Sequence, residues 1–188
     1  MNGRRLENGL IEHCAPTLAG MKCAGLFRYF YDDRNEAVKE IEEINGLLNQ
    51  RGVYVEALRW DDNAVLIYTY RLNQVQKELN DPEVMDLLAS YGYPGNDAGS
   101  CIRYLEGRLY RAGCCFPHEI GVFLGYPLED VKGFIANGGR NCKCCGLWKV
   151  YCNEKEKLQL FHKLKRCSEI YLQVFSEGRD LVQMTVCA

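Results

Sequence analysis

Two adjacent runs of strand-forming residues constrain the fold of this chain more than any other feature of its sequence. Residues 53–60 and 64–70 are rich in β-branched and aromatic side chains, and the polar segment 61–63 joins them. Runs at this separation predict a β-hairpin. The second run is apolar at every position from Val65 to Tyr68, which is typical of a central strand covered on both faces. The hairpin therefore needs helices that pack against it.

The remaining periodicity predicts an α+β fold, with a small mixed β-sheet of about four strands and helices packed against it. Further strands are expected at residues 24–30 and 146–151, and Asp33 is suited to cap the helix that follows the first of them. Pro16 is expected to break or restart the first helix. The chain has no linker or internal repeat, and its 188 residues fit a single globular domain, residues 1–188. The expected helices span residues 6–14, 34–51, 73–79, 82–90, 98–112, 117–124, 128–137 and 153–175.

Charge and hydropathy exclude several classes of protein. The formal net charge is −2 and both signs are scattered along the chain, so a nucleic-acid partner is not expected. No segment is apolar for long enough to span a bilayer, and no secretory signal follows the N-terminal arginines, so we expect a cytoplasmic protein without a membrane partner. The eleven cysteines are an odd number in a chain large enough to fold without disulfides. They favour free thiols in a reducing compartment, where such residues pack as small hydrophobes.

A thiol and an imidazole form the first candidate for chemistry. Cys14 precedes Pro16, which could open a short helix, and the positive end of a helix dipole favours a thiolate. His118 lies in the first turn of another expected helix, where it should stay neutral and could act as a base. Glu119, or Glu12, is placed to orient the imidazole. This set predicts a thiol-dependent hydrolase or transferase, whereas the alternative is that Cys14 packs against the sheet and His118 caps a helix.

A cluster of cysteines forms the second candidate. Cys142, Cys144 and Cys145 lie together, and Cys152 follows seven residues later. Four thiolates could close a tetrahedral zinc or iron–sulfur site, or serve a redox role. The second ligand pair at the usual spacing is missing, however, so the alternative is a loop with incidental cysteines.

Residues 119–135 form the third candidate. Gly121, Gly125 and Val131 match the spacing of a helix-turn-helix, which predicts a DNA-binding regulator as one alternative. Glu129 and Asp130 would then face phosphates at the start of the recognition helix, which opposes binding. A helical hairpin packed tightly through its glycines is the competing interpretation.

Two stretches of the sequence resemble a known family. They are HCAPTLAG at residues 13–20 and FPHEIGVFLGYP at residues 116–127, and the latter continues with EDVKGFI at residues 129–135. Together with residues 145–151, they resemble a family of uncharacterised bacterial proteins, found mainly in anaerobic Gram-positive bacteria and known only as a domain of unknown function. The resemblance covers nearly the whole chain and implies a single-domain cytosolic protein. It supplies no activity and no catalytic residues.

The leading hypothesis is therefore a cytosolic protein of unknown activity that binds a small molecule or a protein partner. Its functional surface is expected around His13–Cys14 and His118–Glu119. The sequence supports an enzyme as well as a binding protein, and it identifies no cofactor. Several aromatic residues could line a ligand pocket, although aromatic residues in strands usually form the core of a sheet. They are Tyr29, Tyr31, Trp60, Tyr68, Tyr70, Tyr91, Tyr93 and Trp148.

Overall fold

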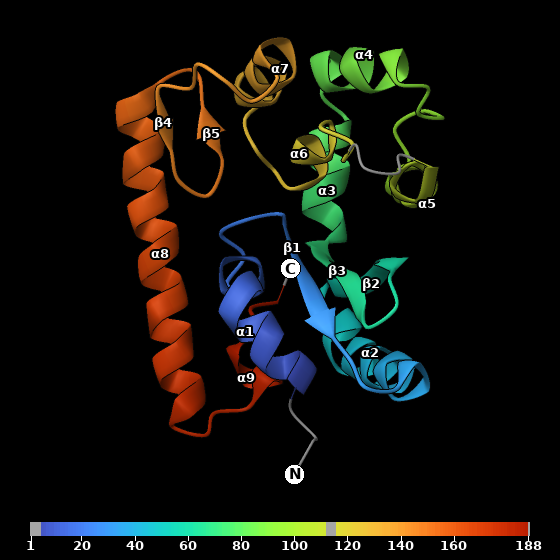
Figure 1. Cartoon of the computed structure of the whole chain (residues 1–188). Coiled ribbons are helices and arrows are strands. Elements are labelled where there is room, and N and C mark those ends of the chain that lie inside the picture. Colours follow the sequence, from blue (N-terminus) through green and yellow to red (C-terminus); the bar gives the residue numbers. More distant parts are fainter. Residues whose placement is uncertain (1–4, 112–115, 188) are drawn as a thin grey trace. The chain divides into compact units, whose positions relative to one another are not determined.

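The computed structural model describes residues 5–111 and 116–187, which form two compact units (Figure 1). Unit 1 comprises Met1–Val75 and Cys167–Ala188, and unit 2 comprises residues 76–166. Two compact units can belong to one domain, so the expected single domain over residues 1–188 stays a prediction. Helices α3 (Leu72–Leu79) and α8 (Glu154–Ser176) each belong partly to both units.

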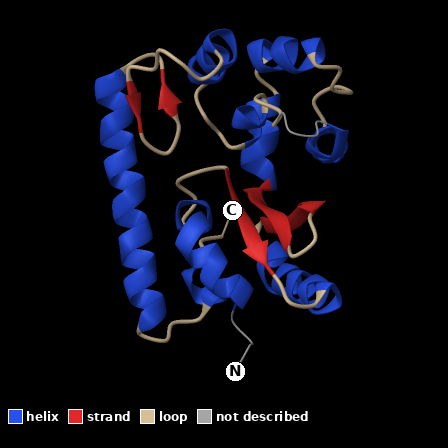
Figure 2. Ribbon diagram, viewed as in Figure 1, coloured by secondary structure: helices blue, strands red, loops and turns tan. Residues whose placement is uncertain are grey.

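Unit 1 is built on an antiparallel sheet of three strands, shown in red in Figure 2. The strands are β1 (Ala24–Phe30), β2 (Val53–Trp60) and β3 (Ala64–Arg71), in the order β1-β3-β2. Every residue of β3 is buried, which confirms the predicted central strand. The hairpin β2–β3 is confirmed as well, with an irregularity of register at Leu58, between Ala57 and Arg59.

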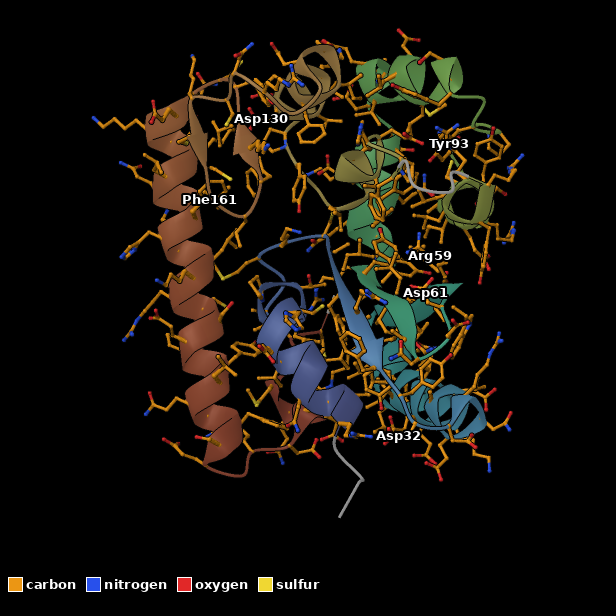
Figure 3. All side chains as sticks on the ribbon, in the orientation of Figure 1. Asp32, Arg59, Asp61, Tyr93, Asp130 and Phe161 are labelled. Atoms are coloured by element: carbon orange, nitrogen blue, oxygen red, sulfur yellow. The ribbon has the colours of Figure 1, made fainter. Side chains whose placement is uncertain are left out.

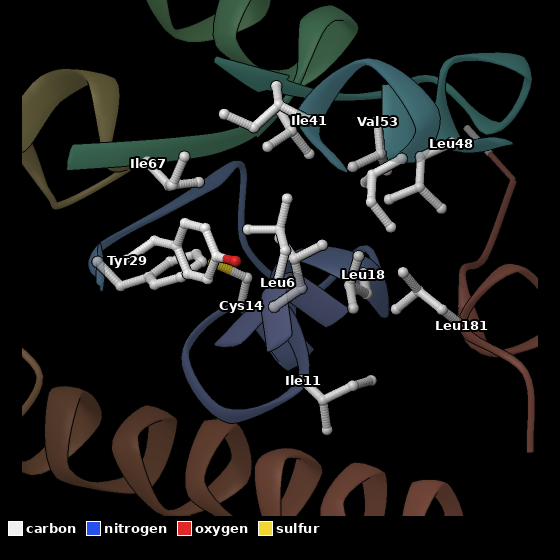
Figure 4. Close-up of a cluster of buried hydrophobic side chains, with 14 of the residues drawn as sticks. Leu6, Ile11, Cys14, Leu18, Tyr29, Ile41, Leu48, Val53, Ile67 and Leu181 are labelled. Carbon is white, nitrogen blue, oxygen red and sulfur yellow. The ribbon is translucent and has the colours of Figure 1, made fainter. Parts of the chain in front are cut away.

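Helices of unit 1 pack against one face of this sheet around a single apolar cluster (Figure 4). They are α1 (Arg5–Leu18), α2 (Arg34–Leu48) and α9 (Leu181–Met184), and a short 3₁₀ turn, η1 (Asn49–Arg51), follows α2. Asp33 caps α2 as predicted, because its carboxylate accepts hydrogen bonds from the N–H groups of Asn35 and Glu36. The cluster includes Leu6, Ile11, Cys14, Leu18, Tyr29, Ile41, Leu48, Val53, Ile67 and Leu181.

The prediction that Pro16 breaks the first helix is wrong, because α1 continues to Leu18 with Pro16 inside it. Pro16 stands near the end of the helix, where its missing N–H leaves only the carbonyl of Glu12 without its usual donor. Glu12 is exposed, so water can supply that hydrogen bond. Cys14 consequently lies in the C-terminal half of α1 and not at a helix N-terminus.

Arg71 secures the C-terminal end of α1. Its side chain is 1% exposed, and its Nε donates to the carbonyl of Thr17 at 2.6 Å. Its Nη2 donates to the carbonyls of Leu18 at 2.7 Å and of Val186 at 2.8 Å. The last carbonyls of a helix have no intrahelical partner, so this cation satisfies two of them and also ties Val186 to the end of α1.

Unit 2 is mostly helical and carries a second, smaller sheet. Its strands β4 (Cys144–Cys145) and β5 (Lys149–Val150) form an antiparallel hairpin that packs on the first half of α8 through a small apolar cluster. The α+β fold is therefore confirmed, but its strands form two antiparallel sheets instead of one mixed sheet. The remaining helices are α4 (Pro82–Ser90), α5 (Ala98–Arg111), α6 (Ile120–Phe123) and α7 (Leu128–Asn137).

Candidate ligand-binding site

Unit 2 contains a cavity of about 280 Å³. Its walls come from three segments, namely residues 118–121 before and within α6, residues 126–134 around α7, and residues 145–149 of the small hairpin. Pockets that bind small molecules typically measure about 300–1,000 Å³ and are lined mainly by apolar and aromatic side chains. This cavity is therefore suited to a compact ligand.

Asp130 holds the hairpin against α7 and so fixes one wall of the cavity. Its side chain is 2% exposed, and its Oδ2 accepts a hydrogen bond from Trp148 Nε1 at 2.9 Å. Its Oδ1 accepts from the N–H groups of Tyr151 at 2.7 Å and Cys152 at 3.2 Å. A buried carboxylate is tolerated when charge-assisted hydrogen bonds surround it, as they do here. Figure 3 labels Asp130 near the small hairpin and α7. Asp130 would face phosphates only if residues 119–135 bound DNA, and in the structure its carboxylate instead points into the protein.

Four ring-bearing side chains contribute to the cavity wall, namely His118, Tyr126, Phe134 and Trp148. The rings of Tyr126 and Trp148 stack with centroids 4.9 Å apart and an interplanar angle of 26°. Trp148 meets Phe161 edge to face at 4.5 Å, which locks the indole in place. On another side, the Phe134 ring contacts the edge of the His118 ring, with centroids 5.0 Å apart. A rigid wall of this kind favours a flat ligand.

Gly121 brings α6 close to α7. A Cβ atom at this position would lie 2.8 Å from Val131 Cγ2 and 3.3 Å from Tyr126 Cδ2, so only glycine fits without a shift. This contact confirms the interpretation of residues 119–135 as a helical hairpin packed through glycine. Helix α6 has only four residues, and the DNA-binding regulator remains a prediction without further support.

The polar groups of the cavity lie on the hairpin and before α6. Lys149 Nζ donates to the carbonyl of Gly139 at 2.6 Å and lies 5.8 Å from the centroid of the Phe134 ring. His118 is exposed, and it precedes α6 instead of lying in its first turn. Cys145 is an exposed free thiol. A cation, an imidazole and a thiol are therefore available to a ligand in this cavity.

Glu119, the third member of the predicted catalytic set, is buried and paired with other side chains of unit 2. Its side chain is 1% exposed and forms an ion pair with Arg108, with 2.5 Å between Nε and Oε1. Tyr93 Oη donates to the same carboxylate at 3.1 Å. Burial, and then the nearby charge of Glu119, raise the pKa of Tyr93 well above its usual value. Glu119 is thus engaged by Arg108 and Tyr93.

Cys14 lies in the core of unit 1, whereas His118 belongs to unit 2. The thiol is fully buried, and a Cβ atom at Gly25 of β1 would lie 2.6 Å from its sulfur. Burial raises the pKa of Cys14 to about 12, although the Thr69 hydroxyl acts in the opposite direction. These observations support the alternative that Cys14 packs against the sheet. Catalysis by Cys14 with His118 stays a prediction.

The four cysteines of the predicted metal site do not converge. Successive side chains of a strand point to opposite faces, so Cys144 and Cys145 diverge. Cys144 packs toward the apolar cluster of Trp148, Val150 and Phe161, and burial raises the pKa of its thiol. Within residues 5–111 and 116–187, no three His, Cys, Asp or Glu side chains are grouped as metal ligands would be. A thiolate metal site therefore stays a prediction that this geometry does not support.

The sequence points to His118 as a candidate base and to Trp148 as one of several aromatic residues that could line a ligand pocket. It points to Cys145 for a different role, as a metal ligand. Tyr126, Phe134 and Lys149 also line the cavity and were not predicted to do so. Asp130 was considered only as part of a DNA-binding helix. No local signal was available for Asp130, because Trp148 lies 18 residues further along the chain. The pairing itself depends on how the hairpin folds back onto α7.

Comparison with known proteins gives a family and no activity. A family model described as "Protein of unknown function (DUF3793)" matches residues 10–185. No curated protein and no solved structure matches the chain. Among the helices of the described residues, none combines the length and the apolar character that crossing a membrane requires.

Proposed function

The chain belongs to the DUF3793 family of proteins of unknown function, and from this premise we propose that it is a binding protein for a small, flat and largely apolar molecule. The observation that carries the proposal is the aromatic cavity of unit 2, whose wall is fixed by the buried Asp130 carboxylate. The hydrogen bond to Asp130 orients Trp148 from within the protein. The site is therefore preorganised, and preorganisation reduces the free-energy cost of binding.

The size of the cavity limits both the ligand and its affinity. Burying about 200 Å² of apolar ligand surface contributes on the order of 5 kcal/mol before the cost of association. A ligand of one or two fused rings would bury such an area. Additional affinity must then come from the few polar groups at the site.

Lys149 and His118 define the polar part of the ligand. The Lys149 ammonium carries three N–H donors, and the acceptor found for it among the described residues is the carbonyl of Gly139. A carbonyl or carboxylate oxygen of the ligand would complete its hydrogen bonds. The ligand is therefore a flat ring system that carries an oxygen acceptor.

The nine described cysteines are all free thiols, which suits a reducing compartment. We place the protein in the cytoplasm on this basis. The binding reaction requires no chemical step, so it is compatible with a buried and unreactive Cys14.

The indole N–H of Trp148 provides a direct test. The chain has two tryptophans, so a ¹⁵N correlation spectrum shows two indole signals, and Trp60→Phe assigns them. We expect flat aromatic carbonyl compounds such as 1-tetralone to shift the Trp148 signal saturably and to leave the Trp60 signal in place.

Two lysines of the same region supply a matched pair of variants. Lys149→Met keeps most of the side-chain volume but removes the charge, and it should weaken binding about ten-fold or more, as expected for one charge-assisted hydrogen bond. Lys143→Met removes an exposed lysine that does not line the cavity and should leave binding unchanged. Equal effects of both variants, or no saturable shift of Trp148, would refute the proposal.

A further inference from the structure

We infer that Cys145 adds covalently to a flat conjugated carbonyl compound, of the quinone class, when that compound occupies the cavity. This inference rests on the proposed function and makes it more specific, because it assigns a reactive group to the ligand. Three observations carry it, namely the pairing of Cys145 with Lys149, the position of both in the cavity wall, and the presence of His118 in the same wall.

The hairpin places the thiol beside the ammonium group. Cys145 and Lys149 are direct partners in the β4–β5 ladder. Direct partners of an antiparallel pair project their side chains from the same face, with Cβ atoms about 4.5–5.5 Å apart. The preceding pair, Cys144 and Val150, belongs to the opposite face, where both residues meet the apolar cluster of unit 2. Alternation along the strands thus separates a packing thiol from a thiol that lines the cavity.

The cavity selects the kind of electrophile. Its walls are aromatic, and the nucleophile among its described residues is a soft sulfur atom that is exposed. A flat, neutral ring system packs beside the Tyr126–Trp148 stack better than a hydrated ion does. Conjugated carbon–carbon double bonds are soft electrophiles, and their carbonyl oxygens accept hydrogen bonds. A quinone combines the flat shape, the electrophilic carbon and the oxygen acceptor.

The addition balances without an external oxidant or reductant. The Cys145 sulfur forms a bond to the β-carbon of the quinone, and the π electrons of the C=C bond move toward the carbonyl oxygen. Lys149 stabilises the negative charge that develops on this oxygen and can supply the proton that neutralises it. His118 accepts the proton that the thiol loses, and its imidazole remains in the wall of the cavity. The carbon that carries sulfur then loses its proton, and the second carbonyl oxygen gains one. This tautomerisation gives a thioether of the corresponding hydroquinone.

Cys187 provides an internal control within the same molecule. It is also an exposed free thiol, and it belongs to unit 1, where Arg51 Nη1 lies 3.5 Å from its sulfur. Both thiols therefore have a cationic side chain nearby, but only Cys145 of the two lines the cavity of unit 2. A difference in their reactivity toward a flat electrophile reports recognition by the cavity.

The experiment treats the full-length protein with limiting 1,4-naphthoquinone and measures the modification of each cysteine by peptide mass spectrometry. We expect Cys145 to react at least about ten-fold faster than Cys187, as is typical of a thiol whose surroundings activate it. Lys149→Met should reduce this ratio, and Lys143→Met should preserve it. An excess of 1-tetralone, which has the fused rings and the carbonyl oxygen but no electrophilic C=C bond, should protect Cys145 and leave Cys187 unprotected.

Iodoacetamide separates recognition from simple exposure, because it is small and polar and has no ring. The ratio of the two rates should fall strongly with iodoacetamide. Equal ratios for the two reagents, or modification of Cys145 no faster than Cys187 by naphthoquinone, would overturn the inference.

Cys145→Ser distinguishes this failure from a failure of the proposed function. The variant removes the nucleophile and leaves the aromatic wall, so 1-tetralone should still shift the Trp148 signal. If naphthoquinone shows no preference for Cys145 but this shift persists, the binding function stands and the covalent step is wrong. If the shift is absent from the wild type and the variant alike, both proposals fail.

Discussion

The two sheets of this protein are stabilised in different ways. The sheet of unit 1 has a fully buried central strand and helices packed on one face around a large apolar cluster. The hairpin of unit 2 has two residues in each strand, and a single buried carboxylate, Asp130, connects it to α7. Apolar packing is distributed over many contacts, whereas the arrangement in unit 2 depends on a few directed bonds. A cavity can persist beside a wall of the second kind because the bonds hold the wall without filling the space.

The largest expected effect tests the distributed packing of unit 1. Ile67 of β3 is fully buried within the apolar cluster, so Ile67→Ala should lower the free energy of unfolding by about 4 kcal/mol. Urea unfolding, followed through the indole signals of Trp60 in unit 1 and Trp148 in unit 2, measures this loss. If the urea midpoint is lowered only for the Trp60 signal, the units unfold separately. If the midpoint is lowered equally for both signals, the result would support the predicted single domain over residues 1–188.

The next effect tests the directed bonds of unit 2. In Asp130→Asn, the amide nitrogen must face either the Trp148 indole N–H or the backbone N–H groups. Because the amide nitrogen is itself a donor, at least one of these N–H groups loses its acceptor. We expect a loss of about 2–3 kcal/mol and a displaced Trp148 indole signal, because a buried donor is left unsatisfied. Asp86→Asn on α4 is the matched control, since Asp86 is exposed, and it should change neither quantity. An unchanged Trp148 signal in Asp130→Asn would show that packing alone fixes the indole.

A smaller effect compares two glycines in helices. Gly121→Ala forces a Cβ atom against Val131 in α7 and should cost about 1–2 kcal/mol. Gly46 lies within α2 with no atom within 4 Å of its added Cβ, so Gly46→Ala should stabilise the protein by about 0.5–1 kcal/mol. Thermal unfolding of both variants gives the comparison. If Gly121→Ala is stabilising as well, α6 and α7 are free to separate slightly, and the cavity wall is less rigid than its contacts indicate.

Local signals made unit 1 predictable. The hairpin, the central position of β3 and the Asp33 cap each depend on residues close together in the sequence, and all three are confirmed. The prediction for Pro16 was wrong because a helix tolerates proline when the carbonyl that loses its N–H donor can bind water. Only the folded structure shows whether that carbonyl is accessible. That error also moved Cys14 to the wrong end of a helix.

The site in unit 2 could be predicted only in part. His118 was identified from its type and position, but the partners of Asp130 lie 18–22 residues away across a turn, and strands of two residues carry no periodicity that reveals them. The faces of Cys144 and Cys145 likewise depend on the register of the hairpin. Without the register, the adjacent Cys144 and Cys145 resemble a pair of metal ligands. In the hairpin their side chains project from opposite faces.

The last effect contrasts the buried thiol of unit 1 with an exposed one. Burial raises the pKa of Cys14 to about 12, so the folded protein keeps this thiol protonated at a pH where the unfolded chain, with its ordinary pKa near 9, releases the proton. The stabilising contribution of the protonated thiol is complete below about pH 8 and decreases as the pH rises between 9 and 12. The stability of the wild type relative to Cys14→Ala should therefore fall by about 1.4 kcal/mol between pH 8 and pH 10, because one unit beyond the unfolded pKa corresponds to about that free energy.

Urea unfolding at a series of pH values measures this difference, and the cavity that Cys14→Ala creates contributes a constant that cancels. Cys187→Ala, which removes an exposed thiol, should show no comparable trend. A difference that is independent of pH for Cys14→Ala would mean that the Cys14 thiol ionises in the folded protein near its ordinary pKa. In that case water reaches the core of unit 1, and Cys14 would regain its place beside Cys145 as a candidate nucleophile.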